Sequence, residues 1–270
     1  MSFKILVLDL DGTLTNSKKE ITKKNREILL KAQKQGVVVV LASGRPTYGI
    51  APLADALELD RFGGYVLAYN GGEIIDWRTK TLLYANVLPD DVLPSLHKSA
   101  AKNGLALLSY DGDHVLTEHP DDEYVAKEAF INKMKIKGTT DFLTDVPRPV
   151  PKCLIVGDPE KLIPVEAELS IDLQDIISVY RSEPYFLELV PMGIDKARSL
   201  AVLLEKLGMT REDMVAVGDG YNDLSMIQYA GMGVAMANAQ EPVRKAADYV
   251  TLSNEEDGVA AVVEKFFLKN

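Results

Sequence analysis

The chain has 270 residues, 47% of them hydrophobic and 26% charged, with a formal net charge of −10 at pH 7. This composition is typical of a globular chain with room for one large domain or two smaller ones. Nucleic-acid-binding domains usually carry a basic patch, and the acidic balance argues against one. No apolar run approaches the roughly 20 residues that cross a bilayer. We therefore expect neither a nucleic-acid partner nor a membrane partner.

The single cysteine, Cys153, excludes an intramolecular disulfide. It lies in the apolar run CLIVG, which favours a buried structural thiol. The N-terminal segment MSFKILVLDLDG reaches acidic residues too early for a signal peptide. Together, these features predict a cytoplasmic location.

The N-terminal part of the chain alternates between strand and helix patterns. The run VVVVLAS is continuously apolar and does not alternate with polar residues, which is typical of a strand buried on both faces of a sheet. Regular alternation of strand and helix predicts a parallel sheet with right-handed crossovers. The predicted elements are, in order, a strand at 3–10, a helix at 20–35, a strand at 37–43, a helix at 46–58 and a strand at 65–70.

The middle of the chain follows a different pattern. In GLALLSYDGDHVLTEH, two apolar runs flank DGD, which predicts a β-hairpin. Strands also come closer together in this segment than in the N-terminal part, which predicts an α+β domain inserted at 82–189. Its further predicted elements are helices near 89–102, 121–134 and 158–170, and strands in VPKCLIVG, DIISVYR and PYFLELV.

The C-terminal part returns to alternation. Its predicted elements are, in order, a helix at 195–207, a strand at 214–219, a helix at 222–230, a strand at 233–236, a helix at 240–247, a strand at 249–252 and a helix at 256–267. We therefore expect an α/β fold with a Rossmann-like doubly wound parallel sheet core. Residues 1–81 and 190–270 are expected to form this core, around the domain inserted at 82–189.

Polar residues follow the ends of four predicted parallel strands. Ligands of open α/β sheets bind outside the carboxyl ends of the strands, so these residues are expected to line one crevice. Each of them alone reads as an ordinary turn residue, but four such strand ends together favour a functional site. The residues are Asp9, Asp11, Ser43, Asn70, Asp219, Asn222 and Asp223.

The carboxylates among these residues predict a metal ion. Asp9, Asp11 and Asp219 would repel one another and raise each other's pKa. A hard cation removes that penalty, and a few oxygen ligands completed by water and a phosphate describe Mg²⁺.

Other groups at the same strand ends suit a phosphate. The Ser43 hydroxyl and the Gly44 N–H are donors for phosphate oxygens. Lys196 begins a predicted helix and is the candidate cation for balancing the phosphate charge, although a lysine taken alone is usually a surface residue.

These residues carry a family resemblance. DLDGT, the serine of ASGR, the lysine of GIDKARSL and GDGYND together resemble the four motifs of the haloacid dehalogenase (HAD) superfamily of phosphohydrolases. The layout resembles the Cof-type branch, in which a large α/β cap domain is inserted between the second and third motifs. YNGG, PYFLEL, GVAMANA and SNEEDGVA extend the likeness to sugar-phosphatase-like members. One departure is Ala197, where a glycine often follows the motif lysine.

The resemblance implies a role for each motif residue. Asp9 is the nucleophile that forms an aspartyl-phosphate. Asp11 protonates the leaving alcohol and then removes a proton from the hydrolytic water. Mg²⁺ is held by the Asp9 carboxylate, the Asp11 backbone carbonyl and Asp219. The groups implied to hold the phosphoryl group are the Leu10 backbone, Ser43, Gly44, Lys196 and Asn222.

Four further residues are candidates at the edge of the site. Asp223 is expected to orient Lys196 or to support the metal ligands. Arg45 and Asn70 either contact substrate or pin loops, and both alternatives stay open. Glu188, on the strand that returns from the insertion, is a candidate for facing the crevice, with an exposed strand carboxylate as the alternative.

These expectations amount to a Mg²⁺-dependent phosphatase of small phosphorylated metabolites. The alternatives are a phosphomutase or phosphotransferase on the same chemistry and a non-catalytic aspartyl-phosphate switch. Asp11 argues against a switch, because a positioned base shortens the life of the intermediate. Sugar phosphates are the first substrate expectation, with pyridoxal phosphate and flavin mononucleotide still open. The sequence does not indicate an oligomeric state.

Overall fold

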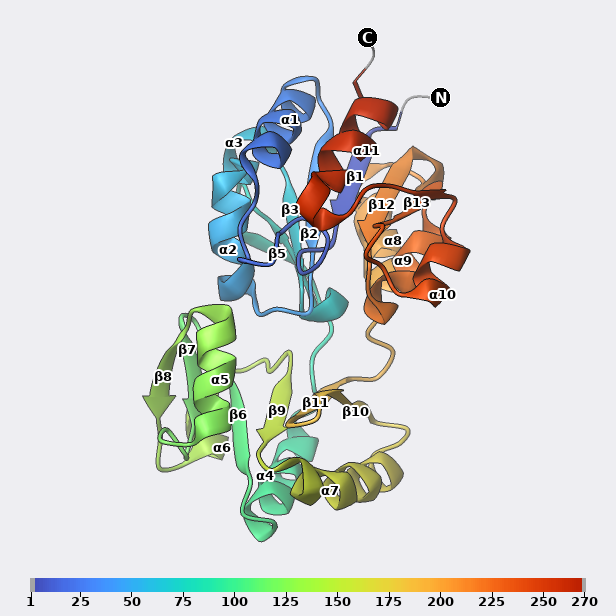
Figure 1. The fold of residues 1–270 in the computed structure, drawn as a ribbon. Helices are drawn as coiled ribbons and strands as arrows, with labels where there is room; N and C mark the ends of the chain where they lie inside the picture. Colours follow the sequence, from blue (N-terminus) through green and yellow to red (C-terminus); the bar gives the residue numbers. More distant parts are fainter. Residues whose placement is uncertain (1–2, 269–270) are drawn as a thin grey trace. The chain divides into compact units, whose positions relative to one another are not determined.

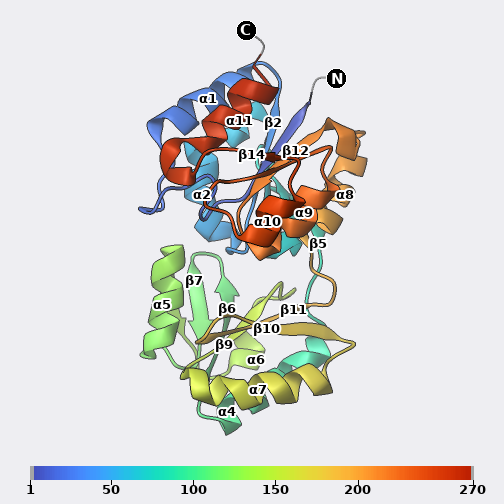
Figure 2. The ribbon, with the colours of Figure 1, turned by 45° about the vertical axis from the view of Figure 1, so that its right-hand side comes forward.

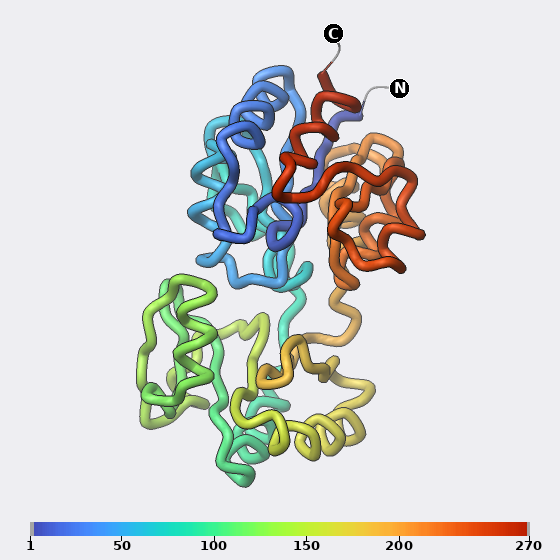
Figure 3. Tube along the Cα trace, viewed as in Figure 1, coloured from blue at the N-terminus to red at the C-terminus, as the bar shows by residue number. Residues whose placement is uncertain are grey.

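A computed structural model describes residues 3–268 of the chain. The chain divides into two compact units, coloured by sequence in Figure 1. The first unit holds the residues up to Tyr84 and those from Asp195 onward, and the second unit is Ala85–Ile194. Figure 3 follows the chain out of the first unit and back into it, so the second unit is an insertion between two parts of the first.

The first unit is built on an eight-stranded sheet. Its order is β14-β13-β12-β1-β2-β3-β4-β5, and the six strands from β14 to β3 are parallel. Taken in chain order, the parallel strands follow the 3-2-1-4-5-6 order of the doubly wound fold. The strands are β1 (Ile5–Leu8), β2 (Val38–Ala42), β3 (Tyr65–Ala68), β4 (Glu73–Asp76), β5 (Thr81–Ala85), β12 (Met214–Gly218), β13 (Met232–Ala235) and β14 (Tyr249–Val250).

Helices cover this sheet. Residues of β1 and β2 such as Ile5 and Val40 pack with Leu200 and Met226 of α8 and α9. Figures 1 and 2 both show α1 beside α11, and the Asn25 Oδ1 of α1 accepts the Ala260 N–H of α11. The helices are α1 (Lys23–Lys34), α2 (Thr47–Ala56), α3 (Leu59–Phe62), η1 (Tyr69–Gly71), α8 (Lys196–Leu207), η3 (Arg211–Asp213), η4 (Tyr221–Asp223), α9 (Leu224–Tyr229), α10 (Glu241–Ala246), η5 (Asn254–Glu256) and α11 (Gly258–Phe266).

The second unit is a six-stranded, mostly antiparallel sheet in the order β10-β11-β9-β6-β7-β8. The predicted DGD hairpin is confirmed, because β6 and β7 pair directly around it. The strands are β6 (Ala106–Asp111), β7 (His114–Thr117), β8 (Lys135–Gly138), β9 (Cys153–Val156), β10 (Ile177–Glu183) and β11 (Phe186–Pro191). The helices are η2 (Asp90–Val92), α4 (Leu93–Lys102), α5 (Glu123–Asn132), α6 (Phe142–Asp145) and α7 (Pro159–Asp172).

An apolar core lies on one face of the second sheet. Leu96 of α4 and Leu162 of α7 pack there against Leu107, Leu187 and Cys153. Burial raises the pKa of the Cys153 thiol to about 12, which suits a packing residue rather than a reactive one.

The predicted α/β fold is confirmed by the sheet and its crossovers, and the differences lie at sheet edges. No strand is predicted at β4, β5 or β8. Most positions of β5 and β8 are exposed or half-buried, so neither shows an apolar run, and β4 has only two buried apolar residues in four. The predicted division of the chain falls after residues 81 and 189, whereas the compact units divide after Tyr84 and Ile194. Both β5 and β11 run past the predicted divisions. Within residues 3–268, none of the helices combines the length and the apolar character that crossing a bilayer requires.

The other face of the second sheet carries a buried polar cluster under α5. Glu128 is 5% exposed, and its Oε1 accepts the Tyr110 hydroxyl at 2.7 Å and the Asn132 Nδ2 at 2.8 Å. Lys152 Nζ pairs with Glu188 Oε2 at 2.7 Å. Burial raises the pKa of Glu128 above its ordinary range, and the charge of Lys152 only partly opposes it. A carboxylate in this position therefore costs stability.

We expect Glu128→Gln to stabilise the protein at neutral pH. The folded chain holds the Glu128 proton to a higher pH than the unfolded chain. The resulting stability is fully present below the unfolded pKa and is lost as pH rises from there through the raised folded pKa. Glutamine keeps an acceptor for Tyr110 and Asn132 without the charge. Thermal unfolding should show the variant melting about 2–4 °C higher at about pH 8, with the gain shrinking towards about pH 4.

Glu168→Gln is the matched control, because this exposed glutamate lies in the same unit and its loss changes the net charge equally. The interpretation is wrong if Glu128→Gln gains nothing at the higher pH, or gains equally at both.

Candidate active site

A buried lysine links three elements at the carboxyl edge of the first sheet. Lys196 is the first residue of α8, and its side chain is 0% exposed. Its Nζ donates to Asp9 Oδ1 at 2.8 Å, to Asp223 Oδ1 at 2.6 Å and to the Ala42 carbonyl at 2.9 Å. Asp9 directly follows β1, Ala42 ends β2, and Asp223 ends η4 beyond β12. The ion pairs thus join both halves of the sheet at its switch point.

The charges in this cluster shift one another. Burial, reinforced by the Asp223 carboxylate, raises the pKa of Asp9 to about 8, although Lys196 opposes this. Burial alone would lower the pKa of Lys196, but Asp223 and Asp9 hold it above its ordinary range. The ammonium therefore stays charged, and the site favours a further cation near Asp9.

Asp223 is held on both carboxylate oxygens. Its Oδ2 accepts the backbone N–H groups of Asp219 and Gly220, both at 2.9 Å, while Oδ1 contacts Lys196. These bonds shape the GDGYND turn after β12 and hold the Asp223 carboxylate against Lys196.

Asp219 lies across from Asp9 and is fixed by the DGT turn. Thr13 Oγ1 donates to Asp219 Oδ1 at 2.6 Å. Gly12 has φ +85°, and a Cβ there would overlap the Asp219 carboxylate. Glycine is therefore required both for the backbone conformation and for the space. Burial raises the pKa of Asp219 to about 6, opposed by the Thr13 hydrogen bond.

Asp11 is held by two cations. Arg45 Nε donates to Asp11 Oδ2 at 2.8 Å, and Arg45 Nη2 donates to Asp11 Oδ1 at 2.6 Å. Lys19 Nζ reaches Oδ1 at 2.7 Å. Burial opposes ionisation, but Arg45 and Lys19 together hold the pKa of Asp11 below its ordinary range.

The second and third strands add an interlocked pair of turns. The Asn70 N–H donates to the Ser43 carbonyl at 2.8 Å, and Asn222 Nδ2 donates to Asn70 Oδ1 at 3.2 Å. Tyr69 and Asn70 are both left-handed, with φ 53° and 55°. A Cβ on Gly44 would lie 3.0 Å from Asn70 Nδ2. The ASGR and YNGG turns therefore pack on each other, and Asn222, which follows β12, hydrogen-bonds to the YNGG turn.

The remaining predicted residues fall in two places. Leu10 is buried between the two aspartates, and its carbonyl accepts the N–H groups of Thr13 and Thr15. Glu188 lies in β11 of the second unit, where it is buried and bonded to Lys152 and to Ser182 Oγ. The alternative of an exposed strand carboxylate is wrong for Glu188, because these partners enclose it; its proposed contact with the crevice stays a prediction.

The donor set fits a hard divalent cation. One carboxylate oxygen from each of Asp9, Asp219 and Asp223 lies within 4.8 Å of the others. Because both oxygens of Asp223 already accept hydrogen bonds, Asp9 and Asp219 are the available pair. Two carboxylates of raised pKa and a side-chain-free Gly12 beside them suit an all-oxygen site for a hard metal cation.

Sequence reasoning missed several contacts. Thr13 and Gly12 belong to the recognised motif, where they read only as turn residues. No sequence pattern marks Lys19 as a site residue. A left-handed backbone conformation at Lys19, with φ 61°, brings its side chain back to Asp11. Asn238, whose Nδ2 donates to the Gly12 carbonyl at 2.8 Å, lies in GVAMANA, far from the motif in sequence.

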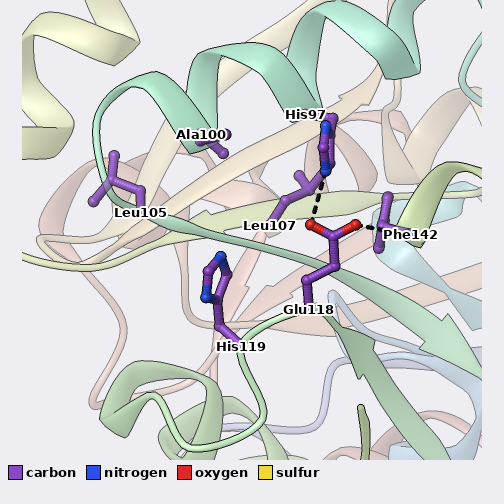
Figure 4. Close-up of a pocket in the computed structure, with 8 residues that line it drawn as sticks. His97, Ala100, Leu105, Leu107, Glu118, His119 and Phe142 are labelled. Carbon is purple, nitrogen blue, oxygen red and sulfur yellow. Dashed lines mark hydrogen bonds and ion pairs between the residues drawn. The ribbon is translucent and has the colours of Figure 1, made fainter. Parts of the chain in front are cut away.

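Figure 4 shows a small pocket within the second unit that none of these residues lines. His97 Nε2 lies 2.9 Å from Glu118 Oε2, and Glu118 Oε1 accepts the Phe142 N–H at 2.8 Å. These bonds connect α4, the end of β7 and α6. This structural role accounts for the pairing of His97 with Glu118.

Lys196→Met should destabilise the protein strongly. The substitution leaves the buried carboxylates of Asp9 and Asp223 without their counter-charge, which we expect to cost about 3–5 kcal/mol. Urea-induced unfolding measures the loss, with Lys206→Met as control, because Lys206 is exposed on the same helix. A Lys196→Met variant as stable as the control would show that the cluster does not support the fold.

Comparison with known proteins agrees with this geometry. The family model described as haloacid dehalogenase-like hydrolase matches residues 6–263. The 5-amino-6-(5-phospho-D-ribitylamino)uracil phosphatase YcsE of Bacillus subtilis (strain 168) is 31% identical over 270 residues, covering 99% of this chain and 97% of YcsE.

Solved structures extend the match. A haloacid dehalogenase-like hydrolase from Bacteroides thetaiotaomicron is 65% identical, with a TM-score of 0.96, and covers 98% of this chain and 100% of its own. The HAD subclass IIB sugar phosphatase BT4131 is 25% identical, with a TM-score of 0.80, and covers 97% and 98%. The predicted family and the predicted enzyme class, a phosphatase, are confirmed: the chain belongs to the haloacid dehalogenase-like hydrolases.

Proposed function

We propose that the protein hydrolyses small phosphomonoesters through an aspartyl-phosphate on Asp9, with Mg²⁺ as cofactor. The observation that carries the proposal is the buried Lys196 between Asp9 and Asp223. A fixed ammonium beside a carboxylate reduces its repulsion towards an incoming phosphate dianion. Asp219, opposite Asp9, supplies the second carboxylate of a cation site.

The first step forms the covalent intermediate. An Asp9 carboxylate oxygen attacks phosphorus, and the bond from phosphorus to the ester oxygen breaks. Asp11 delivers a proton to that oxygen, so the alcohol leaves uncharged. Lys196 and the donors of Ser43, Gly44 and Asn222 hold the phosphoryl oxygens in this assignment.

The second step restores the enzyme. Asp11, now deprotonated, takes a proton from water as the water oxygen attacks phosphorus. The bond between phosphorus and Asp9 breaks, which releases inorganic phosphate and returns the Asp9 carboxylate. Mg²⁺ held by Asp9, Asp219 and the Asp11 carbonyl would neutralise phosphoryl charge in both steps.

The relatives suggest where to look for the substrate. YcsE is named for a phosphorylated ribitylaminouracil, and BT4131 is described as a sugar phosphatase. We infer that the substrate is a phosphomonoester of a sugar or of a polyol-bearing metabolite. Phosphate release across hexose, pentose and ribityl phosphates tests the class. Formation of isomeric sugar phosphates instead of free phosphate would favour a phosphomutase.

Asp9→Asn and Asp11→Asn should separate the two carboxylates. Asp9→Asn should lower turnover of p-nitrophenyl phosphate about 10³-fold or more, because the nucleophile is lost. Asp11→Asn should slow turnover about 10²- to 10⁴-fold through loss of proton transfer, yet retain Mg²⁺ binding by calorimetry, since only its carbonyl is a proposed ligand. Full activity in Asp9→Asn, or an equal loss of Mg²⁺ binding in both variants, contradicts the assignment.

Removing the metal should abolish turnover reversibly. Protein treated with a chelator and then dialysed is expected to lose phosphate release and to regain it on addition of Mg²⁺, because the phosphoryl charge is then neutralised again. Asp219→Asn should require a higher Mg²⁺ concentration for the same rate. Undiminished turnover in chelator would rule out the proposed cofactor.

A further inference from the structure

The Arg45 side chain is half-buried and meets Asp11 in a two-pronged contact. Arg45 Nε and Nη2 donate to the two carboxylate oxygens of Asp11 at 2.8 and 2.6 Å. The Arg45 side chain is 12% exposed. Parallel N–H bonds from a planar guanidinium fix the plane of the carboxylate as well as its position.

Arg45 is itself fixed at both ends. Its N–H donates to Ser43 Oγ at 3.2 Å, and its carbonyl accepts the Tyr69 N–H at 3.1 Å. Its third nitrogen, Nη1, donates to the Gly49 carbonyl of α2 at 3.3 Å. Because each guanidinium nitrogen has an acceptor, the contact with Asp11 belongs to the folded framework and is not a loose surface pair.

The second cation on Asp11 differs in kind. Lys19 reaches Oδ1 from an exposed turn in which its N–H donates to the Asn16 carbonyl at 2.9 Å. Its side chain is 53% exposed, and exposed ion pairs of this type contribute little. Arg45 therefore dominates the orientation of Asp11.

The contacts also distinguish the two oxygens of Asp11. Oδ1 accepts from Arg45 and Lys19, whereas Oδ2 accepts from Arg45 alone among the described residues. A carboxylate oxygen has two lone pairs, so Oδ2 keeps one for a proton. The contact with Arg45 therefore fixes the direction in which the remaining lone pair of Oδ2 points.

We propose that Arg45 is a positioning residue that holds the Asp11 carboxylate in the orientation required for proton transfer. The inference rests on the proposed function, in which Asp11 gives a proton to the leaving oxygen and later takes one from water. Arg45 is not expected to contact the substrate, since its nitrogens are engaged with Asp11 and Gly49.

The role predicts an effect that depends on the leaving group. p-Nitrophenolate departs without protonation, whereas the alkoxide of glycerol 2-phosphate needs the proton from Asp11. Loss of Arg45 should therefore spare formation of the phosphoenzyme from p-nitrophenyl phosphate. It should slow hydrolysis of the phosphoenzyme from either substrate, because that step always uses Asp11 as base.

The test is rapid mixing of Arg45→Met with p-nitrophenyl phosphate and Mg²⁺. We expect a burst of one nitrophenolate per active site, followed by a steady rate about 10²-fold below that of the unsubstituted protein. Turnover of glycerol 2-phosphate should fall at least as far and show no burst. Arg45→Lys should behave like Arg45→Met, because lysine keeps the charge but not the two-pronged contact.

Arg78→Met is the matched control. Arg78 is exposed in the same unit and donates to the carbonyls of Asp60 and Arg61, away from Asp11. Its kinetics should match those of the unsubstituted protein. Thermal unfolding of each variant identifies a folding defect, and Arg45→Lys serves if Arg45→Met does not fold.

Two outcomes overturn the inference: unchanged kinetics in both Arg45 variants, or equal losses on both substrates without a burst in folded protein. Its failure is separable from failure of the proposed function. If the unsubstituted protein releases no phosphate, or Asp9→Asn keeps full activity, the mechanism itself is wrong and the role of Arg45 falls with it.

Discussion

The ion cluster of Lys196, Asp9 and Asp223 is the constraint on which the first unit depends. A lysine with a side chain 0% exposed is stable only where its charge is matched. The match comes from a residue after β1 and a residue after β12, and a carbonyl at the end of β2 accepts the third bond. For these contacts to form, strands from both halves of the sheet must end level with one another along the strand direction. The same constraint gathers charged groups at the carboxyl edge of the sheet.

Backbone conformation at the strand ends supports this cluster. Gly12 gives room to the Asp219 carboxylate, and Thr13 anchors it. Two consecutive left-handed residues, Tyr69 and Asn70, bring the third strand end against Gly44. Left-handed conformations of residues other than glycine cost free energy and concentrate at functional sites. The arrangement therefore pre-organises the carboxyl edge of the sheet before any ligand binds.

The two aspartates of the first motif lie in contrasting surroundings. Burial raises the pKa of Asp9 to about 8, whereas Arg45 and Lys19 hold the pKa of Asp11 below its ordinary range. Residues two apart in the chain thus face different charges, because Gly12 turns the backbone after Asp11. A nucleophilic carboxylate must be ionised, so the proposed role of Asp9 requires a cation beside it that lowers its pKa. The ionised state that Arg45 and Lys19 favour for Asp11 suits the step in which Asp11 takes a proton from water.

The sequence by itself determined the family, the α/β alternation and the strand ends at which Asp9, Ser43 and Asp219 would lie. Local pattern suffices for these features, because β-branched runs and turn residues mark buried strands and their ends. The short edge strands β4, β5 and β8 have no long apolar run, and the sequence did not predict them. Only the tertiary structure decided that Arg45 holds Asp11, that Lys19 returns to the site and that Glu188 pairs with Lys152. Those contacts join side chains from separate elements, and no local pattern records which charges a fold brings within hydrogen-bonding distance.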